Sequence, residues 1–338
     1  MRFISLKGAR GARAFGVMLA VFAGAFCTGA AAGPAAATFP LTIEHQWGAT
    51  TIPHRPLRVV ALGWNDADTA LALGVTPVAI QDWQQLGLTR GSVNPWSQPL
   101  VRGAAPDILP RGDLDFRRIA ALHPDLILDV NGRDNGSQAN YALLSRIAPT
   151  IASPRSVKNN NLPWQQQVRI DALALGRVDA GEQLIAATQS RIDAVRNAHR
   201  GFAGKTFTIN WGVQNGWHSY VRGDVRSQLL EDLGLDLSPA VKELPARNYF
   251  ADLPVERTAD IDADVVLLVA FARPAASIMA EPAVQALSAF RRHRIVLLDN
   301  RRDAELRAAF ATGSTASIAY SLDHLVPRID RALAGHGD

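Results

Sequence analysis

Hydrophobic and polar residues are arranged so that short apolar runs and stretches of helical spacing follow one another along the chain. In the first half, strands are expected at residues 59–63, 77–80, 125–130 and 150–152. The intervening helices are expected at residues 66–73, 114–122 and 138–147. Residues 39–52 alternate around Gly48, which predicts a hairpin at a sheet edge. Strands that alternate with helices predict parallel-type sheets covered by helices, so the expected fold class is α/β.

The middle of the chain predicts a long helix. A helix over residues 164–175 is followed by one that runs from about residue 179 to 200. Asp179 and Glu182 are spaced like a capping box at its start. At ~1.5 Å per residue, about 22 residues span roughly 33 Å, which is about the diameter of a small domain. One stiff helix of this length would allow only small movements between two lobes.

Strand–helix alternation resumes after this helix. Strands are expected at residues 207–211, 217–221, 265–270 and 295–299, and helices at 226–233, at 282–291 and within 312–333. The junctions "LALGV" and "LEDLGL", one in each half, resemble each other. They indicate either two similar lobes bridged by the long helix or junctions common to any α/β protein. The two-lobe interpretation places an N-terminal lobe at 38–163, a helical linker at 164–203 and a C-terminal lobe at 204–338.

Residues 1–37 have the composition of a secretory signal peptide. Four basic residues precede an apolar run at 14–27, and small residues follow it. The run is shorter than the ~20 residues of a membrane span. Cleavage is expected after Ala32 or Ala37, with Ala37 favoured. The four basic residues account for the net charge of +4, so the basic balance does not indicate a nucleic-acid partner.

The only cysteine, Cys27, lies in this segment. Cys27 is an alternative attachment site for a lipid anchor. The bulky Phe26 directly before it argues against lipidation, because a small residue is expected at that position. After cleavage the chain would have no thiol for disulfides, metal ligation or catalysis. The histidines do not have the spacing of metal ligands, so we expect no metal site. The sequence has no motif that pairs a nucleophile with a base, so we do not expect an enzyme. A periplasmic enzyme remains the alternative from a different functional class. Export without cysteines predicts a periplasmic location.

The turn after the first strand reads Gly63, Trp64, Asn65, Asp66. A dinucleotide site would need more glycines there. Ligands of open α/β sheets collect beyond the carboxyl ends of the strands, and Trp64 lies at such an end. Asp66 and Asp68 begin the next helix, where carboxylates favour the helix dipole whatever the function.

Other aromatic and arginine residues occupy loops and strand ends. The aromatic candidates for lining a ligand cleft are Trp64, Trp96, Trp217, Tyr249 and Phe250. The arginine candidates are Arg111, Arg133, Arg222 and Arg307. Each one alone is compatible with ordinary packing or a solvated surface. Together they predict an aromatic, positively charged cleft, which suits carboxylates and other hard oxygen anions.

The segments "RVVALGWNDADTALALGVTPVAI", "DLDFRRIAALHPDLILD" and "LLSRIAPTIAS", followed by the long helix, resemble the ferric-siderophore substrate-binding proteins of ABC importers. The resemblance covers nearly all of the chain after residue 37. It implies two α/β lobes bridged by one long helix, with the ligand between them. It further implies a monomer that passes its ligand to inner-membrane permease subunits. The chelator would hold the iron, so the protein would need no cofactor or metal ligands of its own.

The resemblance also assigns residues. Trp64, Trp96 and, with one gap nearby, Arg111 match cleft residues of the ferric-hydroxamate binders. Arg133 replaces their cleft tyrosine and, like Arg307, resembles the ferric-citrate binders. We therefore expect an anionic, carboxylate-type ferric siderophore, with a hydroxamate siderophore, haem or cobalamin as alternatives.

Two acidic residues match the positions that dock the permease in this class. Asp115 stands where the family pattern has Glu, which keeps the charge but shortens the reach. Glu256 matches the acid of the second lobe. The alternative is that both are ordinary surface acids.

Overall fold

The N-terminal lobe is built on a five-stranded parallel sheet. The computed structural model describes residues 38–83, 92–132, 136–157, 162–271 and 273–338. In pairing order the strands are β5 (Asp107–Leu109), β4 (Ala79–Gln81), β3 (Val59–Ala61), β6 (Leu126–Asp129) and β7 (Thr150–Ala152). Every neighbouring pair is parallel, as the alternation of strands and helices predicts. The sequence does not predict β5, because three residues between prolines are too few to show a period.

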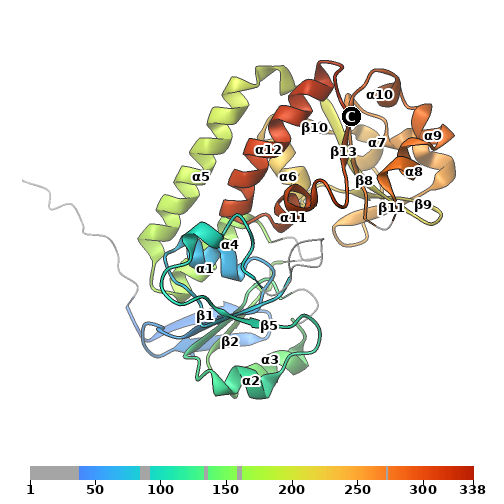
Figure 1. The fold of residues 1–338 in the computed structure, drawn as a ribbon. Helices are drawn as coiled ribbons and strands as arrows, with labels where there is room; N and C mark the ends of the chain where they lie inside the picture. The colour runs from blue at the N-terminus through green and yellow to red at the C-terminus, as the bar shows by residue number, and fades with distance from the viewer. Residues whose placement is uncertain (1–37, 84–91, 133–135, 158–161, 272) are drawn as a thin grey trace, which may run out of the picture. The chain divides into compact units, whose positions relative to one another are not determined.

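Helices cover both faces of this sheet (Figure 1). They are α1 (Asp66–Ala72), α2 (Phe116–Ala121), α3 (Gln138–Leu144) and α4 (Trp164–Ala174). Successive strand residues point to opposite faces. Val59 accordingly packs into the core cluster beneath α1 and α4, whereas Val60 packs into the one beneath α2 and α3. The hairpin expected at 39–52 is present as β1 (Leu41–His45) and β2 (Gly48–Ile52).

The long helix is α5 (Val178–Ala198), and it follows α4 directly. It packs against α4 and against α12 (Thr315–Leu333), the last helix of the chain. Gly181 permits the close approach to α4, since a Cβ atom there would lie only 2.5 Å from the Cβ of Ala172. The predicted bridging helix is therefore confirmed.

The start of this helix lies within one residue of the predicted one, but the predicted capping box is wrong. The helix begins at Val178, so Asp179 lies inside its first turn and Arg177 is the N-cap, without a side-chain capping bond. Glu182 instead accepts two hydrogen bonds from Arg169 of α4. The tertiary pairing of α4 with α5 thus uses the carboxylate that the spacing assigned to a cap.

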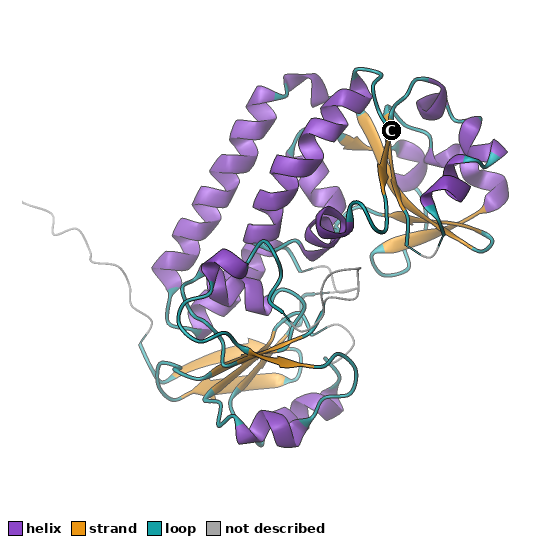
Figure 2. Cartoon of the chain, in the orientation of Figure 1, coloured by secondary structure: helices purple, strands orange, loops and turns teal. Residues whose placement is uncertain are grey.

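The C-terminal lobe contains a six-stranded mixed sheet (Figure 2). Along its path lie β11 (Phe250–Pro254), β9 (Gly216–Tyr220), β8 (Thr206–Val213), β12 (Val265–Val269) and β13 (Ile295–Leu298), and β10 (Asp236–Leu237) also pairs with β8. β8, β10, β12 and β13 are parallel, whereas β9 and β11 run antiparallel to their neighbours. The parallel arrangement therefore holds for only part of this lobe. Two residues connect β8 to β9, and a connection this short can join only antiparallel strands.

Seven α-helices of four or more residues belong to the described part of this lobe, besides a 3-10 helix at Val255–Ile261. Besides α12 they are α6 (Val225–Asp232), α7 (Pro239–Lys242), α8 (Ala275–Met279), α9 (Pro282–Gln285), α10 (Ser288–Arg291) and α11 (Ala304–Thr312). The single helix expected at 282–291 is two helices, because Leu287 has an extended ψ of 143°. The sequence does not predict α11. Almost all of its residues are buried, so no polar face marks its period.

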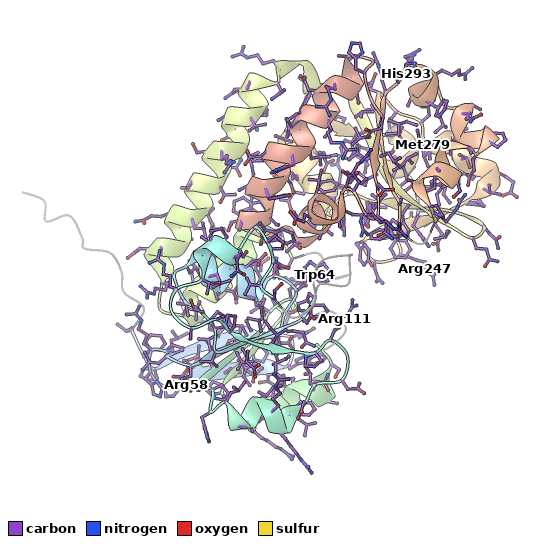
Figure 3. All side chains as sticks on the ribbon, in the orientation of Figure 1. Arg58, Trp64, Arg111, Arg247, Met279 and His293 are labelled. Carbon is purple, nitrogen blue, oxygen red and sulfur yellow. The ribbon has the colours of Figure 1, made fainter. Side chains whose placement is uncertain are left out.

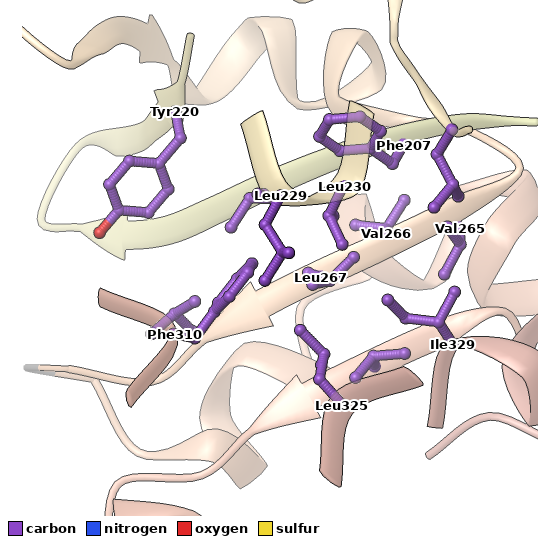
Figure 4. Close-up of a cluster of buried hydrophobic side chains, with 14 of the residues drawn as sticks. Phe207, Tyr220, Leu229, Leu230, Val265, Val266, Leu267, Phe310, Leu325 and Ile329 are labelled. Atoms are coloured by element: carbon purple, nitrogen blue, oxygen red, sulfur yellow. The ribbon is translucent and has the colours of Figure 1, made fainter. Parts of the chain in front are cut away.

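The core of the C-terminal lobe forms where α6 and α12 meet the sheet. Figure 4 shows Leu230 of α6, Val266 and Leu267 of β12, and Leu325 and Ile329 of α12 in one buried cluster. The described residues of both lobes belong to one compact unit. None of the helices within the described ranges is long and apolar enough to cross a membrane.

Candidate functional site

A carboxylate closes the turn after β3. Asp66 Oδ2 accepts hydrogen bonds from the backbone N–H groups of Gly63 and Val130, both at 3.0 Å. A Cβ atom at Gly63 would lie 2.3 Å from this carboxylate, so the turn requires glycine there. Dinucleotide-binding folds hold a phosphate at the corresponding helix start. Here a side chain of the protein occupies that place, and the half-buried Trp64 lies beyond it.

Asp66 also belongs to a buried cluster of acids. Gln167 Nε2 of α4 donates to Asp66 Oδ1 at 2.7 Å and to Asp171 Oδ2 at 2.9 Å. Burial raises the pKa of Asp66 to about 6, although backbone hydrogen bonds act to lower it. Burial, together with the charge of Asp66, raises the pKa values of Asp129 and Asp171 well above their usual range. The cluster braces α1, β6 and α4 behind the turn that carries Trp64.

Asp171→Asn is expected to stabilise the protein near neutral pH. Between about pH 4 and the raised folded pKa, the unfolded chain loses its carboxyl protons before the folded chain does, so stability falls as the pH rises. The amide cannot ionise and therefore avoids this loss. The free energy of unfolding should rise by roughly 1–3 kcal/mol at pH 7, the scale of a buried unpaired polar group. Chemical denaturation at pH 4 and pH 7 measures the difference, which should shrink toward pH 4.

The control for this prediction is Glu44→Gln, which alters an exposed acid of β1. It should change the stability little at either pH. Equal stability of Asp171→Asn and the unaltered protein at both pH values would show that the acid cluster does not govern the pH dependence.

Two tryptophans and an arginine form the N-terminal-lobe part of the candidate site. Trp64 follows β3 and Trp83 follows β4, so both lie at carboxyl ends of parallel strands. Their rings meet edge to face, with centroids 5.3 Å apart. The guanidinium carbon of Arg111 lies 5.4 Å from the centroid of the Trp83 ring. Figure 3 shows Trp64 and Arg111 on this lobe.

Helix α11 connects this part to the C-terminal lobe. The indole N–H of Trp64 donates to the carbonyl oxygen of Ala311 at 3.3 Å. Arg307 lies one turn earlier on α11, and its guanidinium carbon is 4.8 Å from the centroid of the Phe271 ring. Arg307 Nη2 also donates to Asn300 Oδ1 at 2.8 Å. One turn of α11 thus separates Arg307 from Ala311, the residue that Trp64 contacts.

Aromatic rings around Trp211 form the C-terminal-lobe part. The centroids of His218, Tyr220, Phe250 and Phe271 lie 4.7, 4.6, 5.2 and 6.1 Å from that of Trp211. Tyr249 stacks on Tyr220, with centroids 6.1 Å apart. The Arg226 guanidinium lies 4.0 Å from the Tyr220 ring centroid, a cation–π contact. Asp224 pairs with Arg226 at 2.7 Å, so this buried charge is balanced.

These contacts define an aromatic–arginine set, whose two parts are linked through the backbone of Ala311 in α11. Its members are Arg111, Trp83, Trp64, Arg307, Phe271, Trp211, Tyr220, Phe250 and Tyr249. Arg111 and Trp83 line a cavity of about 380 Å³. Trp211 and Phe271 line another of about 770 Å³, whose lining is mostly apolar. The rings of Trp83, Trp211 and Phe271 and the guanidinium of Arg111 thus line space large enough for a small organic ligand, whereas Arg307 is only 3% exposed and lines neither cavity.

Trp217, a predicted ligand contact, borders the cavity of about 770 Å³ but has an almost fully buried side chain. Its side chain is 1% exposed, lies in the lobe core and donates through Nε1 to Thr258 at 3.0 Å. Adjacent strand residues point to opposite faces. His218, which pairs in register with Trp211, shares the face of the aromatic–arginine set, so its neighbour Trp217 faces inward.

Two further candidates lie away from this set. Trp96 is 9% exposed and donates through Nε1 to Asp68 Oδ2 at 2.6 Å, which places it in packing between the lobes. Arg222 is exposed and pairs with Glu231 at 2.9 Å. Trp64, Arg111, Arg307, Tyr249 and Phe250 belong to the aromatic–arginine set, and their contact with a ligand stays a prediction. Arg133 lies outside the described residues. The predicted signal peptide at residues 1–37, which includes Cys27, also lies outside them.

Sequence reasoning missed several members of the set. Trp83 and Phe271 each follow a parallel strand within two residues of its end, so the strand-end rule could have found them. Tyr220 could not be found this way, because only the antiparallel pairing of β9 with β8 brings it beside Trp211.

The site has no metal-binding group of its own in the described part of the chain. There, no three or more His, Cys, Asp or Glu side chains gather to hold an ion. Asp115 and Glu256 are exposed, one on each lobe and outside the aromatic–arginine set.

Comparison with known proteins places this geometry among binding proteins. The profile of a family described as periplasmic binding protein matches residues 59–302. The probable siderophore-binding lipoprotein YfiY of Bacillus subtilis (strain 168) is 26% identical over 67% of each chain. The Fe(3+) dicitrate-binding periplasmic protein FecB of Escherichia coli (strain K12) is 23% identical over 86% of this chain and 92% of its own. The crystal structure of a periplasmic solute binding protein from Mycobacterium smegmatis covers 87% of this chain and 98% of its own, with 31% identity and a TM-score of 0.73.

Proposed function

Because the chain belongs to the family of periplasmic binding proteins, we propose that it captures a ferric siderophore and delivers it to the permease of an ABC importer. The names of two relatives, a siderophore binder and a ferric dicitrate binder, support this function. The observation that carries it is the aromatic–arginine set, which runs from Arg111 through Trp64 and α11 to Trp211. The relatives are binding proteins rather than enzymes, as expected for this chain.

The ligand class is an anionic, carboxylate-bearing ferric chelate. Arg111 and Arg307 belong to different lobes, and guanidinium forks match carboxylate oxygens. Burial lowers the pKa of Arg307, yet a guanidinium stays charged at any physiological pH. Arg133 remains a predicted third contact. A neutral hydroxamate complex would gain less from these charges and is the first alternative.

Haem and cobalamin are the second alternative. Haem needs an axial side-chain ligand, commonly His, Cys, Met or Tyr. Tyr220 is only 2% exposed, which leaves the half-buried Tyr249 as the tyrosine candidate in the set. A ferric chelate needs no such ligand, because the chelator supplies the donor atoms to iron.

Titration of the purified protein with ferric citrate, ferrichrome, haemin and cyanocobalamin tests the ligand class. Trp64, Trp83 and Trp211 lie in the set, so bound ligand should quench tryptophan fluorescence. We expect ferric citrate to bind at least about tenfold more tightly than ferrichrome, the effect of one additional contact of about 1.4 kcal/mol. Tight binding of ferrichrome without a response to ferric citrate would reverse the assignment. A Soret band in the protein as purified would indicate haem.

The cellular setting is part of the same proposal. The composition of residues 1–37 supports export by a cleaved signal peptide and a periplasmic location. The protein acts as a monomer, and Asp115 and Glu256 contact the permease subunits. Sequencing the N-terminus of the exported protein tests the cleavage after Ala37.

A further inference from the structure

A buried carboxylate of α1 gathers hydrogen bonds from both lobes. Asp68 is 1% exposed. Its Oδ1 accepts from Ser97 Oγ at 2.7 Å and from Asn94 Nδ2 at 3.1 Å. Its Oδ2 accepts from Trp96 Nε1 at 2.6 Å and from Ser314 Oγ at 2.7 Å. Within the described ranges no basic side chain forms an ion pair with Asp68, so these neutral donors carry the stabilisation of its charge.

The donors come from segments far apart in the sequence. Asn94, Trp96 and Ser97 belong to the stretch after β4, whereas Ser314 is the N-cap of α12 and lies 246 positions from Asp68. Ser314 is well oriented for this contact, because its own oxygen and backbone N–H are fixed by a capping box with Ser317. The first turn of a long helix also favours a nearby negative charge.

Apolar packing surrounds the same junction. Trp96 forms a buried cluster with Ala308 and Ala309 of α11, and Ala316 and Tyr320 of α12 pack against it. Alanine side chains let the indole ring approach both helices closely. The hydrogen bond from Trp64 to Ala311 is a second contact on the same helix, α11. Trp96 and Trp64 therefore both hold α11 against the N-terminal lobe.

A buried carboxylate without a basic partner is not explained by stability alone. Removing such a charge from water is costly, and apolar residues at buried ionic positions are often as stable or more so. Hydrogen bonds, unlike apolar contacts, are directional and disfavour other relative orientations of the groups that they join. One of the four hydrogen bonds of Asp68, from Ser314, fixes α12 against α1, and the other three hold the stretch after β4 against α1.

We propose that Asp68 is a positioning residue that locks the two lobes in one orientation, so that both ends of the aromatic–arginine set are in place before the ligand arrives. What the set binds rests on the proposed function, whereas the lock itself concerns only the two lobes.

The test measures the interlobe distance without ligand. Spin labels are attached at Ser145→Cys and Ala286→Cys, an exposed position in each lobe, in the full chain carrying Cys27→Ser so that no other cysteine remains. The otherwise unaltered chain should give one narrow distance distribution. Asp68→Asn preserves the size of the side chain but replaces an acceptor oxygen by an amide donor, and it should broaden the distribution. If only about a tenth of the molecules then remain competent, affinity for ferric citrate should fall roughly tenfold.

Two serine variants separate the lock from helix capping. Ser314→Ala removes the bond to Asp68 and one half of the capping box, whereas Ser317→Ala removes only the other half. We expect broadening in Ser314→Ala and none in Ser317→Ala. If Asp68→Asn fails to fold, this serine pair decides the question. Narrow distributions in every folded variant would overturn the lock. Failure of all chelates to bind would overturn the proposed function and leave the distance result standing.

Discussion

Asp115→Asn combined with Glu256→Lys is expected to abolish uptake of the ferric chelate while leaving the affinity of the purified protein unchanged. The resemblance assigns one docking carboxylate to each lobe, and both residues are exposed and outside the aromatic–arginine set. Asp115 is also the N-cap of α2, where its side chain accepts the Arg118 N–H at 3.0 Å. Asn caps a helix as well as Asp does, whereas Lys at this position would cost about 1 kcal/mol of stability.

Uptake of radiolabelled iron citrate by host cells that lack their own copy measures transport, and fluorescence quenching measures affinity. Glu44→Gln combined with Glu243→Lys is the matched control, since it makes the same charge changes at exposed acids elsewhere on the two lobes. It should transport normally. Normal transport by the docking variant, or an equal loss in the control, would refute the docking assignment. A fall in ligand affinity would place these acids in the binding site instead.

Arg111→Met and Arg307→Met should each weaken binding of ferric citrate by about 10- to 100-fold, because a charge-assisted hydrogen bond contributes roughly 1.5–3 kcal/mol. Methionine is long and flexible, so it can keep the packing against the Trp83 and Phe271 rings while removing the charge. The two arginines lie on different lobes and contact different rings. Their effects should therefore multiply in the double variant.

Arg222→Met serves as the control for lost positive charge, because Arg222 is exposed and pairs with Glu231 away from the set. Its affinity should stay unchanged. Thermal unfolding of each variant separates lost binding from lost folding. Full affinity in the double variant would exclude both arginines from the ligand site, and an equal loss in Arg222→Met would indicate only a long-range charge effect.

The candidate site could be predicted in part. Trp64 was identifiable because it follows the first strand at its carboxyl end. A nucleotide site would have a glycine-rich turn there, so a large aromatic residue indicated a different kind of ligand. Arg111 and Arg307 were identifiable from the family resemblance. The burial of Trp217 could not be predicted, since the register of β9 with β8 sets which residues of these strands face inward. Asp66 and Asp68 looked like equivalent helix-start acids, but one closes a turn and the other joins the lobes.

The sequence by itself determined the α/β class, the strand–helix order of the N-terminal lobe, the long helix and the position of Trp64, because local periodicity and turn residues encode these features directly. Only the tertiary structure decided the antiparallel part of the second sheet, the burial of Trp217, the helix α11 and the partners of Asp68. Each of these depends on segments far apart in the chain, such as Ser314 meeting Asp68, or on burial that removes the polar face from a helix. A pattern of neighbouring residues carries no information about such long-range contacts. The packing of the whole chain determines them.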